Sequence, residues 1–277
     1  MSYTQTHPGL LNPGGILSEI VVKKIDEVEA AKAARPVNVL EQSEFFHRSC
    51  FILSDFIKDP QRTGIIAEFK RASPSKGIIN NQADVIEVTR AYADAAASAL
   101  SVLTDSSFFG GSTADLVTAR NANQIPILRK DFMIDEYQVI EAKSLGTDII
   151  LLIAAILTPQ HLKTLAAQAK KLGLNVLLEV HNQEELQRSL CHDIDAVGVN
   201  NRNLVDFTVS VQHSYDLVKH IPNQFLKISE SGISNPQTIK ELKQAGFNGF
   251  LIGENFMKTD NPGKAMAEFV GEMGDGV

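Results

Sequence analysis

Residues 145–178, LGTDIILLIAAILTPQHLKTLAAQAKKLGLNVLL, contain one complete strand–helix–strand unit. The apolar runs Asp148–Leu152 and Asn175–Leu178 are typical of strands, and Pro159–Leu172 between them has helical periodicity. Thr158 supplies a capping side chain directly before the proline that begins this helix, and a glycine follows the helix where a left-handed residue is favoured. Two strands joined by a helical crossover lie parallel, so this unit predicts a parallel sheet.

The same pattern occurs eight times along the chain. The strand-type runs are Gly64–Phe69, Ala99–Leu103, Pro126–Leu128, Asp148–Leu152, Asn175–Leu178, Ala196–Val199, Phe225–Ile228 and Gly249–Ile252. The helical segments are Ala83–Ala95, Ala114–Asn121, Glu136–Leu145, Pro159–Leu172, Gln183–Leu190, Val211–Lys219, Pro236–Ala245 and Pro262–Val270. Eight units favour a closed barrel over an open doubly wound sheet, and a barrel typically uses about 250 residues. We therefore predict an α/β protein in which residues 1–277 form a single (β/α)8 TIM barrel domain.

Residues 14–60 precede the first predicted strand and have a helical pattern of their own. Ile16, Ile20, Ile25 and Val28 form an expected apolar stripe among lysines and glutamates. Four phenylalanines, at positions 45, 46, 51 and 56, follow this stripe. The segment is expected to be a helical N-terminal extension of the barrel. It either packs against the outside of the barrel or caps one of its mouths.

Composition narrows the classes of function. The chain has a net charge of −7 and 44% apolar residues, which suits a large buried core and not a nucleic-acid-binding surface. The two cysteines, Cys50 and Cys191, have no CxxC spacing, and the seven histidines form no metal-binding motif. No secretory signal or membrane-spanning run is apparent, because the longest apolar run, Ile149–Leu157, is far shorter than a bilayer requires. We expect a cytoplasmic protein without nucleic-acid or membrane partners. It is expected to be a monomer, with a weak homo-oligomer as the alternative.

Charged and amide side chains stand at the carboxyl ends of several predicted strands. Because residues two apart in a strand share a face, these side chains are in phase with the barrel interior. They are Glu68, Lys70, Lys130, Glu179, Asn200 and Glu230, and Arg202 comes just after Asn200. Buried charges are costly unless they are paired or functional, and barrel enzymes place their reacting groups at this face. The pattern indicates an active site, and the structural alternative is a ring of salt bridges that plugs the barrel.

Two glycine-containing loops follow the last two strands. Ser229–Ile233 comes after the seventh strand, and Gly253–Asn255 comes after the eighth. Glycines let backbone N–H groups approach an anion, and barrels commonly bind phosphate at these two loops. Ordinary turns are the alternative, but the two positions together predict a small phosphorylated substrate.

The quoted residues carry a resemblance to a known family. The matching stretches are 66–75 (IAEFKRASPS), 100–105 (LSVLTD), 108–112 (FFGGS), 126–132 (PILRKDF), 177–181 (LLEVH), 198–204 (GVNNRNL), 229–233 (SESGI) and 250–253 (FLIG). In this order they resemble indole-3-glycerol phosphate synthase, over essentially the whole chain. The resemblance extends to the helical extension at residues 14–60.

The resemblance implies a reaction in which 1-(2-carboxyphenylamino)-1-deoxyribulose 5-phosphate closes to indole-3-glycerol phosphate with loss of carbon dioxide and water. Lys130 resembles the family residue that acts as the acid and protonates the ketone oxygen during ring closure. A lysine suits this role because it normally carries a proton at neutral pH. Glu179 is the implied carboxylate of the dehydration step. Lys70 would bind the substrate carboxylate and could also act as the acid, and the sequence leaves open which lysine acts in dehydration.

The remaining implied roles are binding and orientation. Glu68 and Glu230 would orient the lysines and the sugar hydroxyls, and Asn200 and Arg202 would bind polar groups of the substrate. The implied phosphate-site residues are Ser73, Ser231, Gly232 and Gly253. Phe109, Phe132 and Leu151 resemble the apolar wall around the anthranilate ring, although a plain core role fits them nearly as well. No metal and no organic cofactor is implied.

One position departs from the family pattern. Many relatives have a small serine after the glycine of the eighth strand, where this chain has Glu254. A carboxylate facing the phosphate would repel it. We expect the Glu254 carboxylate to point away and only its backbone N–H to donate.

Two other functions remain open at this point. One is an aldolase that uses Lys130 as a Schiff-base nucleophile. The other is an inactive barrel that only binds a phosphorylated ligand, which the presence of both Lys130 and Glu179 disfavours.

Overall fold

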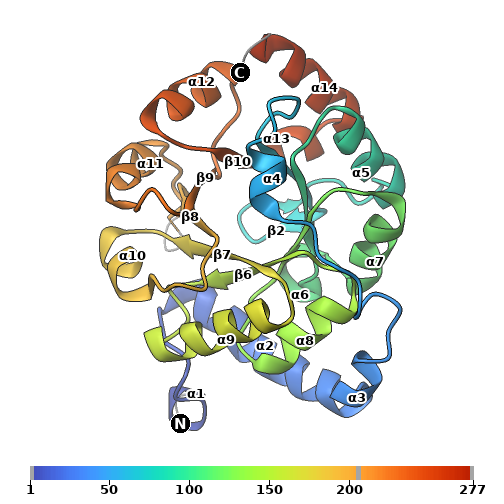
Figure 1. The fold of residues 1–277 in the computed structure, drawn as a ribbon, viewed down its shortest axis with the longest axis vertical. Coiled ribbons are helices and arrows are strands. Elements are labelled where there is room, and N and C mark those ends of the chain that lie inside the picture. Colours follow the sequence, from blue (N-terminus) through green and yellow to red (C-terminus); the bar gives the residue numbers. More distant parts are fainter. Residues whose placement is uncertain (1–2, 204–206, 275–277) are drawn as a thin grey trace.

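A computed structural model describes residues 3–203 and 207–274. Its parallel strands form a closed barrel in the order β1-β10-β9-β8-β7-β6-β5-β4, with helices around the outside (Figure 1). The barrel strands are β1 (Ile65–Phe69), β4 (Ala99–Leu103), β5 (Ile127–Lys130), β6 (Ile149–Ile153), β7 (Asn175–Val180), β8 (Ala196–Asn200), β9 (Leu226–Glu230) and β10 (Gly249–Ile252). The predicted (β/α)8 barrel is confirmed.

A helix follows each barrel strand. These helices are α5 (Val85–Asp94), α7 (Thr113–Ala122), α8 (Glu136–Ser144), α9 (Pro159–Lys171), α10 (Gln183–Ser189), α11 (Gln212–Leu217), α12 (Pro236–Ala245) and α14 (Pro262–Met273). The expected helix-start residues act as caps: the side chain of Thr158 accepts a hydrogen bond from the backbone N–H of His161, and that of Asn235 from Gln237. Gly173 ends α9 with φ +75°, in the left-handed region that glycine adopts without strain.

Five predicted strands end too early, β6 and β8 by one residue and three others by two. The structure extends β5, β7 and β9 by two residues beyond the predicted ends, so they include Lys130, Glu179 and Glu230. Each of these charged residues pairs with a neighbouring strand: Lys130 with Leu103, for example, and Glu230 with Asn200. When only the local sequence is considered, a charged residue suggests that the strand has ended. Here each charged side chain points into the open end of the barrel while its backbone stays in the sheet.

The barrel interior below these charges is apolar. Ile66, Leu128, Leu177 and Ile228 each lie two residues before a charged strand end and are fully buried. They fill the barrel as side chains pointing inward from different strands. The charged groups therefore stand on an apolar floor.

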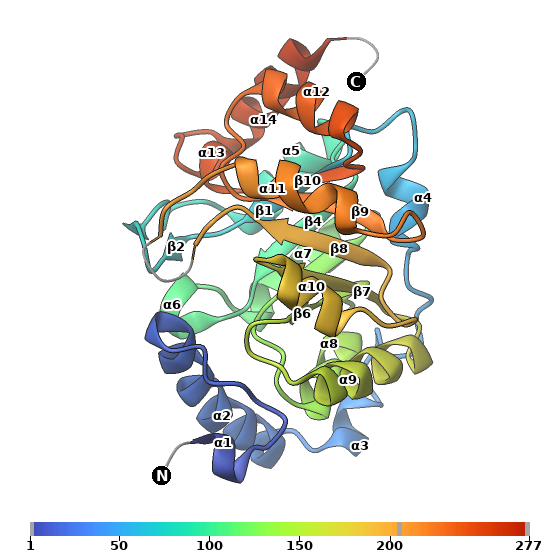
Figure 2. The ribbon, with the colours of Figure 1, turned by 90° about the vertical axis from the view of Figure 1, so that its left-hand side faces the viewer.

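The extension contacts both ends of the barrel. Helix α2 (Gly15–Ala34) lies at the end where the strands terminate, together with α6 (Ser106–Phe109) and the hairpin β2 (Ala72–Ser73) and β3 (Gly77–Ile78), as Figure 2 shows. Helix α4 (Leu53–Ile57) lies at the opposite end. There the backbone N–H of Leu53 donates to Asn175, the first residue of β7. Both expected roles of the extension, packing against the barrel and capping a mouth, are observed.

The predicted apolar stripe of the extension was wrong in part. The buried residues of α2 are Leu17, Ile20, Val21, Lys24 and Val28, whereas Ile16 and Ile25 are only half-buried. The helix packs against the barrel with the face that carries Lys24, because the Lys24 ammonium group binds carboxylates of the barrel. The extension is also not helical throughout, because a non-helical stretch separates α3 (Val37–Leu40) from α4. The short α1 (Tyr3–Thr6) precedes α2, and the short α13 (Glu254–Met257) follows β10.

Candidate active site

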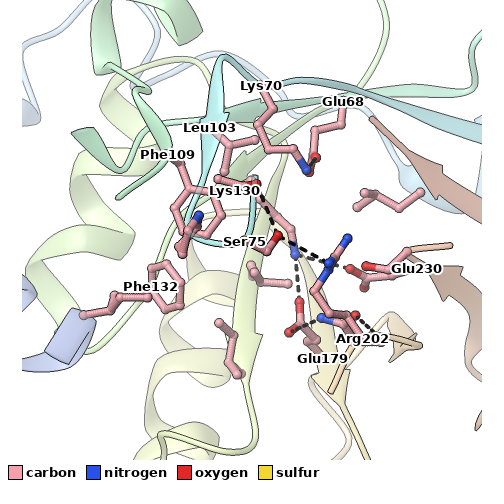
Figure 3. A pocket seen from close by; sticks show the side chains of 18 of the residues that line it. Glu68, Lys70, Ser75, Leu103, Phe109, Lys130, Phe132, Glu179, Arg202 and Glu230 are labelled. Carbon is pink, nitrogen blue, oxygen red and sulfur yellow. Dashed lines mark hydrogen bonds and ion pairs between the residues drawn. The ribbon is translucent and has the colours of Figure 1, made fainter. Parts of the chain in front are cut away.

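A cavity of about 890 Å³, counting the solvent in its mouth, opens at the carboxyl ends of the strands. Figure 3 shows Lys70, Lys130 and Glu179 directed into it. Its lining includes Glu68, Lys70, Ser73, Phe109, Lys130, Phe132, Leu151, Glu179, Asn200, Arg202, Glu230 and Ser231. An adjoining depression is lined by Gly232 and Gly253. The sequence-predicted site residues thus gather at one mouth of the barrel.

Lys130 lies between two carboxylates at the floor of the cavity. Its Nζ is 2.7 Å from Glu179 Oε2 and 3.2 Å from Glu230 Oε2. Its side chain is 15% exposed, and those of the two glutamates are 4% and 2% exposed. The three groups come from β5, β7 and β9, so only the closed barrel brings them together.

In this arrangement the pKa values of the three groups are shifted in different directions, so the groups differ in protonation state. Burial alone would lower the pKa of Lys130, but the charges of Glu179 and Glu230 raise it above its usual value. Burial opposes the charge of Glu179 too, yet Lys130 and His181 hold its pKa at about 2. Burial raises the pKa of Glu230 to about 7, because it outweighs the lowering effect of Lys130 and the charge of Glu179 adds a smaller raising effect. The cluster therefore presents an ammonium acid beside an ionised carboxylate.

Lys70 occupies the opposite wall of the cavity. Its Nζ is 2.6 Å from Glu68 Oε1, and its side chain is 17% exposed. Gly253 lies against Glu68: a Cβ at this position would come 2.8 Å from the Glu68 Cβ. The absence of a side chain at Gly253 lets β1 and β10 approach closely enough to hold Glu68 under Lys70.

Asn200 and Arg202 connect Glu179 to the rim. The Asn200 side-chain amide donates to Glu179 Oε1 at 3.1 Å, and its oxygen accepts from the backbone N–H of Arg202. The Arg202 guanidinium donates to Ser75 Oγ at 3.3 Å and to Glu254 Oε2 at 3.2 Å. The Glu254 carboxylate therefore stays inside the mouth. Its direction relative to a bound phosphate remains a prediction.

Apolar side chains form the remaining wall. The rings of Phe109 and Phe132 are 6.0 Å apart between centroids, and Leu151 lies on the same cavity. Sequence reasoning missed the contribution of the extension, since Leu17 and Ile20 of α2 also line this wall. Their helical spacing with Lys24 was the available signal.

Lys24, which holds the extension at the cavity, is another residue that the sequence analysis missed. It is 4% exposed, and its Nζ lies 2.6 Å from Glu27, 3.0 Å from Asp105 and 2.9 Å from Asp131. Asp105 and Asp131 come just after β4 and β5, so this lysine fixes α2 over the cavity. Burial would lower the pKa of Lys24, but Asp131 and Asp105 raise it above its usual value.

Two features bear on cofactors and membranes. Within residues 3–203 and 207–274, no group of three or more histidine, cysteine, aspartate or glutamate side chains is placed to hold a metal ion. In the same part of the chain, no helix has both the length and the apolar character that crossing a membrane requires.

Comparisons with known proteins agree in one family. The family model described as indole-3-glycerol phosphate synthase matches residues 17–269. Indole-3-glycerol phosphate synthase of Bacteroides thetaiotaomicron is 47% identical over 92% of this chain and 97% of its own length. That of Laribacter hongkongensis is 43% identical over 91% of this chain and 97% of its own. A crystal structure of KGPDC from Streptococcus mutans is 14% identical, has a TM-score of 0.58 and covers 76% of this chain and 96% of its own, which shows the fold alone.

Proposed function

The chain belongs to the indole-3-glycerol phosphate synthase family and catalyses the reaction of that family, and we propose that Lys130, Glu179 and Lys70 carry out this reaction in the barrel cavity. The substrate is 1-(2-carboxyphenylamino)-1-deoxyribulose 5-phosphate. Its conversion to indole-3-glycerol phosphate forms a carbon–carbon bond and releases carbon dioxide and water. The observation that supports the proposal most is the position of Lys130 between two buried carboxylates.

Lys130 is the acid of ring closure. The aromatic carbon that carries the carboxylate attacks the ketone carbon, and negative charge develops on the ketone oxygen. A protonated amine at the cavity floor donates a proton to that oxygen and stabilises its charge. The two glutamates keep Lys130 protonated, because the charged form is the one they attract. The same effect disfavours the Schiff-base alternative, which needs a neutral amine as nucleophile.

Dehydration requires an acid and a base. Glu179 is ionised and removes the proton from the ring carbon, while a lysine protonates the departing hydroxyl group. Lys70 faces the same cavity as Lys130, so either ammonium group can reach an intermediate bound there. Glu68 and Glu230 orient the two lysines, and Asn200 orients Glu179.

The ends of the substrate bind to different walls. The anthranilate ring packs against Phe109, Phe132 and Leu151, and its carboxylate meets Lys70. The phosphate binds at the rim, with Arg202 on one side. The other residues proposed for the phosphate end are Ser73, Ser231, Gly232 and Gly253. This orientation directs the ketone toward Lys130.

The proposal extends to the state of the protein in the cell. We propose one domain made of barrel and extension, acting as a monomer in the cytoplasm without metal, organic cofactor, nucleic acid or membrane partner. The net charge of −7 supports the absence of a nucleic-acid partner. Analytical ultracentrifugation tests the monomer directly.

The deciding experiment is incubation with the ketose phosphate while indole fluorescence is followed. We expect indole fluorescence from the wild type and a loss of kcat of about 100-fold or more for Lys130→Met. Lys264→Met, at a side chain 71% exposed on α14, is the matched control and should retain full activity. Borohydride trapping separates the aldolase: a covalent adduct on Lys130 without indole formation would overturn the proposal.

A further inference from the structure

His181 lies directly behind the proposed base. It follows β7, and its ring stands between two glutamates, with Nδ1 3.2 Å from Glu185 Oε2 and Nε2 3.6 Å from Glu179 Oε1. Nε2 is buried and has no hydrogen-bond partner among the residues that the structure describes. A buried polar atom without a partner is costly, so this position calls for an explanation.

Glu185 fixes the orientation of the ring. Its Oε2 accepts a hydrogen bond from the backbone N–H of His181 at 2.8 Å, and the same oxygen faces Nδ1. Glu185 is itself placed by Asn182, whose side chain accepts from the Glu185 backbone N–H at the start of α10. Nδ1 is therefore the donor toward Glu185, and Nε2 is left to exchange its proton with Glu179.

The proposed reaction consumes one proton in each turnover. The substrate carboxylate leaves as neutral carbon dioxide, so its negative charge must be balanced by a proton from outside. The ketone oxygen takes up two protons and leaves as water, and the enzyme recovers one proton from the ring carbon through Glu179. One proton must therefore come from solvent in each turnover, and where Lys130 is the acid of both steps it must arrive while the substrate covers the cavity.

We propose that this proton enters through His181, which passes it to Glu179 and from there to Lys130. The inference rests on the proposed function. The N–H bond at Nε2 breaks as Glu179 Oε1 takes the proton. A half-turn of the carboxyl group brings that proton to Lys130 Nζ, which has just given its own to the ketone oxygen. Water in the neighbouring depression then reprotonates Nε2, which requires the ring to swing briefly toward that depression. His181 does not touch the substrate and acts as a positioning residue for Glu179 that also transfers a proton.

Solvent reaches His181 by a separate opening. His181 and Glu185 line a depression beside α10 that shares Leu17 and Arg202 with the substrate cavity. The His181 side chain is 15% exposed. A substrate filling the main cavity leaves this depression open on its outer side. The 3.6 Å separation between Nε2 and Oε1 is of the kind that tightens when substrate binds.

The surroundings of His181 favour its charged form. Burial would lower its pKa, but the hydrogen bond to Glu185 and the charges of Glu179, Glu185 and Glu230 raise it above the usual value. The titratable or charged groups facing this region are Glu179 on β7, Glu185 on α10, Glu230 on β9, Lys130 on β5, Arg202 after β8 and His213 on α11. An imidazolium beside an ionised carboxylate is ready to donate.

The test is His181→Asn, which keeps a polar side chain but cannot relay a proton. We expect kcat to fall about 10- to 100-fold with KM changed by less than about twofold, because the substrate contacts remain. Added imidazole should restore kcat in a dose-dependent manner, and the solvent deuterium isotope effect on kcat should increase. His192→Asn, at an exposed histidine beyond the far end of α10, is the matched control and should behave like the wild type.

Each other outcome has a defined meaning. Unchanged kcat in His181→Asn, or a loss of kcat that imidazole does not restore, would overturn the relay. If this variant does not fold, His181→Gln serves for the same measurements. Glu185→Gln should give a smaller loss of kcat, because the ring remains but its orientation is no longer fixed. Failure of the proposed function would appear separately, as a wild type without indole fluorescence.

Discussion

Arg202 and Glu254 form an ion pair across the cavity rim, with 3.2 Å between Arg202 Nη2 and Glu254 Oε2. Lys76 Nζ lies 3.8 Å from the other carboxylate oxygen. The pair joins the loops that follow β8 and β10, next to the residues proposed to bind phosphate. In the proposed binding mode, the Glu254 carboxylate therefore competes with the substrate phosphate for the Arg202 guanidinium.

Glu254→Gln should therefore strengthen substrate binding. The variant removes the competition of a carboxylate for Arg202. Because the Glu254 side chain is 35% exposed, solvent screens the effect, and we expect KM to fall by only about two- to fivefold with kcat nearly constant. Steady-state kinetics and inhibition by inorganic phosphate measure the change.

Glu268→Gln is the control for this prediction, because it removes an exposed ion-pair partner on α14, far from the rim. It should leave KM unchanged. A higher KM for Glu254→Gln would mean that the ion pair positions Arg202 for the substrate, contrary to our expectation.

Lys24→Met should destabilise the protein strongly. The variant leaves Asp105 buried without its counterion and removes one of the two cations that pair with Asp131, which keeps Arg129; breaking a buried pair in this way costs about 3–5 kcal/mol. Urea denaturation measures the free energy of unfolding. Lys32→Met on the same helix, at a side chain 35% exposed, should cost less than about 1 kcal/mol. Equal losses in the two variants would refute the anchoring role of Lys24.

The sequence predicted the barrel because its signals are local and repeated. Thr158 and Asn235 cap helices, Gly173 ends one, and each apolar run is flanked by such markers. The strand ends were harder to place, since Lys130 and Glu230 belong to strands only through pairing with distant neighbours. Such pairing joins separate strands of the sheet, and no local pattern of residues contains it.

The residues of the candidate site were partly predictable, because the alternation of side chains along a strand is also a local pattern. Alternation along each strand directed Glu68, Lys130 and Glu179 to the interior, and the closed barrel then brings them to one mouth. The contribution of α2 was not predictable in this way. Lys24 was hidden among the other lysines of an amphipathic helix, and only its contacts with the ends of β4 and β5 reveal its role.

Glu230 should make the stability of the protein depend on pH near neutrality. Its pKa is about 7 in the folded protein, above the ordinary 4.5, so the folded state binds more protons than the unfolded state between these values. The free energy of unfolding therefore falls as pH rises through this window. The pKa of Glu179 is lowered to about 2, so the change in unfolding free energy that its titration causes is complete below this pH window.

The glutamine in Glu230→Gln cannot ionise. This variant should therefore lack the part of the decline in unfolding free energy that Glu230 causes. We expect the unfolding free energy of the variant, relative to wild type, to rise by about 1–3 kcal/mol between about pH 5 and about pH 8. Urea denaturation at several pH values measures it. Other titrations, including that of His181, largely cancel in the difference. Parallel curves for the two proteins would show that Glu230 does not titrate in this range.

Gly198→Ala should disable the enzyme with a single methyl group. Gly198 lies in the middle of β8, and a Cβ there would overlap Glu230 Oε1 and come 3.3 Å from the Leu177 side chain. Since Glu230 is 1% exposed and cannot move into solvent, its carboxylate must shift away from Lys130. We expect kcat to fall by about 10- to 100-fold and stability by about 1–3 kcal/mol, the usual cost of overpacking a core.

Gly271→Ala on α14 is the matched control, because no atom lies within 4 Å of its added Cβ. The control should keep full activity and a stability equal to or above that of wild type, since alanine favours helix. Full activity in Gly198→Ala would show that the contact between Lys130 and Glu230 is dispensable for ring closure.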